Sequence, residues 1–169
     1  MKTTKSNIAV FWMAGLCMVF AGQLVSAGGS MLKGGVPGVY AQQVNKPVSE
    51  VYDTLYKSLE DARFFVVLEP NLGKNLSYFS KKWGDDYNRN KLSEIRSMVF
   101  CHAWYANKVS NIDPAMLGFC PLHLTLVEHQ GKTTVLFNRP SVIAKNRPAE
   151  DLFKEIEKEV IAAIQRGLK

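Results

Sequence analysis

Two amphipathic helical segments, near the two ends of the chain, constrain the fold most. The first follows Pro47, and its apolar residues recur at helical spacing: Val48, Val51, Tyr52, Leu55, Leu59 and Ala62. The second follows Arg147-Pro148 and ends at Gly167, with the apolar stripe Ala149, Leu152, Phe153, Ile156, Val160, Ala163 and Ile164. Because each stripe covers only one face, both segments must pack against a shared apolar surface.

The remaining segments supply that surface as a sheet. Hydrophobic alternation predicts strands over 39–44, 95–101, 122–128 and 133–137, and the run Phe64-Phe65-Val66-Val67-Leu68 predicts a buried strand. Gln130-Gly131 joins the last two strands as a hairpin. The sequence therefore predicts an α+β fold over 39–169. It is a two-layer sandwich in which a mainly antiparallel sheet carries the amphipathic helices on one face.

Two stretches between the strands have weaker patterns. Leu76, Phe79 and Trp83 are spaced as a short helical stripe, and the polar residues from 85 to 90 indicate a turn. Residues 103–111 predict a short helix or turn, which Asp113-Pro114 ends because the residue before a proline is disfavoured in the α conformation.

The N-terminus has the three parts of a secretory signal peptide. Lys2 and Lys5 give a positive start, and an apolar run follows over 8–21. Val25-Ser26-Ala27 places small residues before a cleavage point between Ala27 and Gly28. An uncleaved anchor is the alternative, but the run is short for a membrane span of about 20 residues. Residues 1–27 are therefore expected to be removed on export.

Cleavage leaves 142 of the 169 residues and lowers the formal net charge from +6 to +4, because Lys2 and Lys5 are lost. This charge gives no electrostatic reason to expect a nucleic-acid partner. The glycine-rich stretch 28–38 is expected to be a flexible leader. The mature protein is expected in the periplasm, or outside the cell where there is no outer membrane, without membrane contact.

Two cysteines, Cys101 and Cys120, remain after cleavage. In an oxidising compartment an even pair favours a disulfide, which would close a loop of about 20 residues and stabilise the fold by about 3 kcal/mol. The alternatives are a soft-metal or thiol-redox site and a pair of unlinked buried thiols. Thiol, imidazole and thioether are ligands that Cu(I) prefers, and five residues near the cysteines are candidate ligands for a metal or a small molecule: His102, Trp104, Tyr105, Met116 and His123.

No local catalytic motif accompanies these residues. The chain contains no CxxC and no HExxH sequence, and no catalytic residue is assigned. No cofactor is predicted apart from the soft-metal alternative. The sequence thus favours a non-catalytic exported domain that binds a small ligand or a periplasmic protein. The ligand is expected between sheet and helices or beside Trp104 and Tyr105, and Trp83 and Tyr87 are further aromatic candidates. Whether the domain forms a homo-oligomer stays open.

Several short motifs link the chain to a known family. They are Met98-Val99-Phe100-Cys101, Asp113-Pro114 with Leu117, and Pro121 before the hairpin. Through them, residues 39–165 resemble the domain of unknown function 302 family, which implies a strand–helix–four strands–helix fold and no assigned activity. Members often have Asn-Pro where His102-Ala103 stands, and leucine where Cys120 stands. The departures suggest an exported subgroup with its own site.

Overall fold

The computed structural model describes residues 35–169. The expected signal peptide (1–27), its cleavage point between Ala27 and Gly28, and the leader before residue 35 lie outside the described residues. The strands are β1 (Val39–Val44), β2 (Phe65–Leu68), β3 (Glu94–Cys101), β4 (Leu122–His129) and β5 (Lys132–Asn138). The α-helices are α1 (Val48–Asp61), α2 (Leu72–Ser77), α3 (Ser80–Trp83), α4 (Ala103–Ile112), α5 (Pro140–Ile143) and α6 (Glu150–Gly167), and two 3-10 helices are η1 (Gly84–Asp86) and η2 (Pro114–Phe119).

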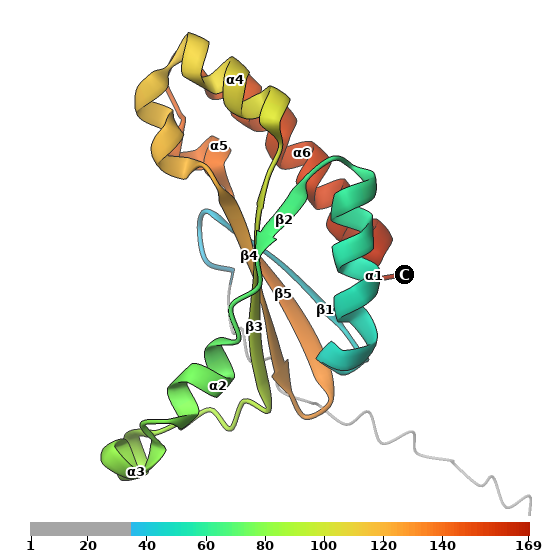
Figure 1. Cartoon of the computed structure of the whole chain (residues 1–169), viewed down its shortest axis with the longest axis vertical. Helices are drawn as coiled ribbons and strands as arrows, with labels where there is room; N and C mark the ends of the chain where they lie inside the picture. Colours follow the sequence, from blue (N-terminus) through green and yellow to red (C-terminus); the bar gives the residue numbers. More distant parts are fainter. Residues whose placement is uncertain (1–34) are drawn as a thin grey trace, which may run out of the picture. The chain divides into compact units, whose positions relative to one another are not determined.

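The strands form one sheet in the order β1-β5-β4-β3-β2, and each neighbouring pair is antiparallel. Helices α1 and α6 cover one face of this sheet (Figure 1). The predicted α+β two-layer sandwich is therefore confirmed. Gln130 and Gly131 join β4 to β5 with positive φ angles of 52° and 69°, which a tight hairpin turn requires.

The core lies between the sheet and these two helices. Alternate residues of β3, β4 and β5 face it, and those that are almost fully buried are Met98, Phe100, Leu124, Leu126, Val135 and Phe137. The expected stripes of α1 and α6 pack against them. On the other face, Ser97 and Thr125 share a hydrogen bond of 2.8 Å between their hydroxyl groups, and His123 is exposed. The period-two pattern therefore assigns the two faces correctly.

The strand predicted at 64–68 is present as β2, but the prediction that it is buried is wrong. Phe64 is fully buried, but it precedes β2, while Phe65, Val67 and Leu68 are 52%, 61% and 61% exposed. The reason is that β2 is an edge strand with β3 as its sheet neighbour, and its register shifts between Val66 and Leu68. An apolar run alone does not distinguish an edge position from a central one.

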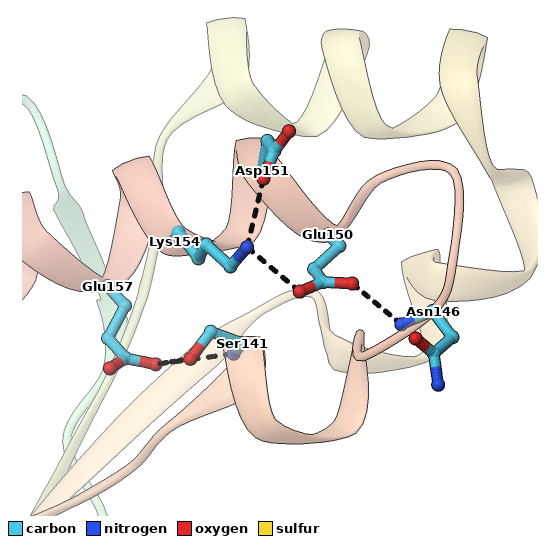
Figure 2. Close-up of polar contacts among 6 residues, drawn as sticks. All are labelled: Ser141, Asn146, Glu150, Asp151, Lys154 and Glu157. Atoms are coloured by element: carbon cyan, nitrogen blue, oxygen red, sulfur yellow. Dashed lines mark hydrogen bonds and ion pairs between the residues drawn. The ribbon is translucent and has the colours of Figure 1, made fainter.

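A buried carboxylate fixes the chain between β5 and α6. Glu157 of α6 is 5% exposed and accepts a hydrogen bond from Arg139 Nε at 2.7 Å. It also accepts hydrogen bonds from the hydroxyl and the backbone N–H of Ser141 in α5, as Figure 2 shows. On the exposed side of the same helix, Lys154 contacts Glu150 at 2.8 Å. That ammonium group and the N–H of Asn146 hold the pKa of Glu150 below its ordinary value. These contacts hold α5, and the loop that joins α5 to α6, against α6.

A close contact between α1 and α6 depends on a glycine. A Cβ added at Gly167 would lie 2.7 Å from Leu55 Cα and 3.1 Å from the carbonyl oxygen of Thr54. The Thr54 hydroxyl donates a hydrogen bond of 2.7 Å to the Gly167 carbonyl. We expect Gly167→Ala to lower the free energy of unfolding by about 1–3 kcal/mol, since backbone atoms must move apart.

Chemical denaturation of Gly167→Ala and Gly118→Ala checks this expectation. Gly118 is the matched control, because nothing lies within 4 Å of a Cβ added there. Equal stability of the two variants would show that the helices do not approach as closely as described.

Candidate functional site

The two cysteines lie at one end of the central strand pair. The last pair of the β3–β4 ladder is Phe100 with Leu122. Cys101 follows Phe100 directly, and Cys120 lies two residues before Leu122 on the adjacent chain segment. Both are half-buried, and both are free thiols in this structure. The structure thus brings the pair together, as both the disulfide and the soft-metal alternatives require.

Both cysteines line one small cavity, which we call the thiol cavity. Its volume of about 20 Å³ has room for one water-sized occupant. The remaining wall is mainly apolar and comprises Phe64, Phe100, His102, Tyr105, Ala106, Leu122, Phe153 and Ile156. Burial raises the pKa of the Cys120 thiol, and the nearby charge of Cys101 raises it further. A raised thiol pKa keeps Cys120 protonated at neutral pH, which disfavours a role as nucleophile.

His102 closes this cavity from the start of α4. Its ring meets Phe64 edge-on at 5.3 Å between centroids and lies 4.7 Å from the ring of Tyr105. Its Nδ1 atom is buried and has no hydrogen-bond partner, although buried polar atoms are nearly always paired. Tyr105 is fixed by its hydroxyl, which donates to Glu155 Oε1 of α6 at 2.9 Å.

The other candidate residues lie elsewhere. Trp104 is 59% exposed on α4, with the Lys108 ammonium 5.4 Å from its ring centroid. Met116 is buried in η2 and is not part of the cavity wall. His123 is exposed on the face of the sheet opposite the core and lines a separate hollow. The structure therefore gathers Cys101, His102, Tyr105 and Cys120 and separates the remaining three.

Within residues 35–169, no group of three or more His, Cys, Asp or Glu side chains is placed to hold a metal ion. The soft-metal hypothesis therefore concerns the thiol pair and not a larger cluster. In the same residues, no helix combines the length and the apolar character needed to cross a membrane.

A larger hollow lies at the start of β3, at the end of the strand opposite to Cys101. It has a volume of about 290 Å³ and is lined by Gly73, Leu76, Trp83, Asp86, Tyr87, Asn88, Arg89, Asn90, Leu92 and Ile95. We call it the Trp83 hollow. Phe79 stacks behind Trp83, with centroids 5.0 Å apart and an interplanar angle of 22°. Sequence reasoning identified Trp83 and Tyr87 as aromatic candidates, but the polar residues beside them suggested only a turn.

The segment that carries Cys120 is anchored by an ion pair that sequence reasoning missed. Asp113, at the start of η2, is 5% exposed and accepts two hydrogen bonds from Arg147, at 2.9 Å from Nε and 2.6 Å from the terminal nitrogen. The sequence signalled Asp113 only as a helix end. The pairing joins η2 to the loop before α6 and so helps to position Cys120.

Comparison with known proteins identifies the family. The model of the domain of unknown function DUF302 matches residues 40–167. The chain belongs to the DUF302 family. A crystal structure of an uncharacterized conserved DUF302 protein from Bacillus stearothermophilus has a TM-score of 0.66 and 22% sequence identity, and the match covers 78% of this chain and 98% of that chain. At this identity the likeness shows a shared fold. No curated protein matches the chain.

We expect Asp113→Asn to lower the free energy of unfolding by about 1.5–3 kcal/mol, because it weakens two hydrogen bonds to a charged group. Asp86→Asn is the matched control: Asp86 faces Arg89 at 3.6 Å, but its side chain is 81% exposed. The free energy of unfolding of Asp86→Asn is expected to stay within about 0.5 kcal/mol of the wild-type value. Urea denaturation compares the two, and equal losses would mean that the Asp113–Arg147 pair does not anchor η2.

Proposed function

We propose that this DUF302 protein is an exported, non-catalytic domain that binds a small polar molecule in the Trp83 hollow. The observation that carries the proposal is the volume of about 290 Å³ bounded by aromatic and polar side chains. Ligand sites typically have volumes of about 300–1,000 Å³, apolar walls and a few polar groups that orient the ligand. The Trp83 hollow lies at the lower limit of this range, which suits a ligand of one or two rings.

The walls of the hollow suit a ring with one apolar face. The Trp83 side chain is 40% exposed, and Phe79 supports it from behind, so its ring offers a flat stacking surface. The rim combines a carboxylate acceptor from Asp86, guanidinium donors from Arg89 and an amide from Asn90. Hydroxyl groups both donate and accept hydrogen bonds and so match this mixture. A saccharide has both features, namely C–H groups on one face of the ring and hydroxyl groups around its edge.

The expected export supports the same conclusion from another direction. A protein released from the cytoplasm meets cell-envelope saccharides, whereas the +4 charge of the mature chain gives no reason to expect nucleic acid. The proposal assigns binding and no reaction step to the domain.

Tryptophan fluorescence tests the proposal. Of the three tryptophans, Trp12 lies in the expected signal peptide, so Trp104→Phe leaves Trp83 as the one indole of protein that begins at Gly28 after export. We expect a saturable change in Trp83 emission when mono- and disaccharides are added to this variant, and no change with free amino acids.

Isothermal titration of Trp83→Phe supplies the control. Removal of the larger stacking surface is expected to weaken binding about tenfold, which corresponds to about 1.4 kcal/mol. The absence of saturable binding by any saccharide, or undiminished binding by Trp83→Phe, would contradict the assignment of the hollow.

A further inference from the structure

The thiol cavity is independent of the Trp83 hollow, because the two lie at opposite ends of β3. Ile95, near the start of the strand, lines the hollow, and Cys101, at its end, lines the cavity. The cavity combines two free thiols, space for one atom-sized occupant of about 20 Å³ and an unpaired buried imidazole nitrogen. These features together make the cavity a candidate site for a small ligand.

The ligand chemistry selects among soft ions. Thiolates favour Cu(I), zinc and iron–sulfur clusters, but structural zinc takes four ligands and the clusters take four cysteines. A pair of thiolates, in contrast, is a complete ligand set for Cu(I), which accepts linear two-coordination. The apolar wall formed by Phe64, Phe100 and Leu122 limits access of water and of competing hard ligands. Both cysteines remain half-buried, so an ion can reach them from solvent.

The charge of a Cu(I)–dithiolate complex suits the position of the two cysteines beside α4. Binding of Cu(I) replaces two thiol protons and forms a complex with one net negative charge, without any change in oxidation state. Helix α4 begins two residues after Cys101, and no side chain caps its first turn. The positive end of the helix dipole therefore lies next to the site and favours a negative charge there.

We propose that Cys101 and Cys120 bind one Cu(I) ion as a two-coordinate thiolate pair. The thiolates supply the affinity. His102 lies in the cavity wall beside the pair but is not a ligand, because no three His, Cys, Asp or Glu side chains of residues 35–169 are placed to hold a metal ion together. Met116 and His123 take no part, because neither belongs to the wall of the cavity.

An anaerobic titration of the reduced mature protein with Cu(I), in competition with the chelator bicinchoninate, tests this site. We expect one Cu(I) per chain. Cys101→Ser and Cys120→Ser should each weaken binding by more than about 100-fold. Met116→Leu and His123→Gln are the matched controls and should bind as the wild type does.

A second measurement needs no variant and so does not depend on how well the serine variants fold. Cu(I) should protect both Cys101 and Cys120 of the wild type from alkylation, as located by mass spectrometry of the digested protein. The proposal is overturned if the chelator retains all the copper, if the serine variants bind as tightly as the wild type, or if copper leaves the alkylation of both cysteines unchanged. None of these outcomes bears on saccharide binding in the Trp83 hollow.

Discussion

The register between β3 and β4 is the constraint on which the rest of the structure depends. It pairs Met98 with Leu124 and Phe100 with Leu122, which turns these side chains toward α1 and α6. A shift of one residue would expose the apolar set and bury the polar one, so the core fixes this register strongly. The same register brings Cys101 and Cys120 together just beyond the last pair. The position of the thiols is therefore a consequence of core packing.

The connection between these strands is held in place at several points. Val109 of α4 and Met116 of η2 are buried in the core, and Asp113 is paired with Arg147. Tyr105 binds α6 through Glu155. The connection is therefore tied to α6 and to the core, which restrains the cavity wall that it forms. A preorganised site loses less entropy when it binds than a flexible one does.

The amount that sequence could predict differs from element to element. The stripes of α1 and α6 and the hairpin at Gln130-Gly131 were predictable, because periodicity and turn chemistry are local signals. The exposure of β2 at the edge of the sheet was not predictable, since it depends on which strands lie beside β2. Trp104 and Tyr105 were expected to act together, but consecutive residues on a helix point about 100° apart. One is therefore exposed, while the other is buried.

In the candidate site, too, some features followed from the sequence and others depended on the tertiary structure. The proximity of Cys101 and Cys120 followed from two expected neighbouring strands, whereas the exclusion of Met116 and His123 required knowledge of which face each occupies. The Trp83 hollow arises where α2, η1 and the start of β3 meet, and its polar residues resemble an ordinary turn in sequence. Likewise, the Asp113–Arg147 pair joins residues 34 positions apart, a separation at which no local pattern operates.

Joint determination of metal content and thiol state tests the central claim most directly, namely that the β3–β4 register builds a soft-ion site. The protein would be isolated anaerobically from the envelope of copper-supplemented cells, and its copper and its free thiols counted after denaturation in the presence of a copper chelator. The account predicts one copper per chain and two free thiols, from Cys101 and Cys120. A metal-free protein in which these two cysteines form a disulfide would contradict it.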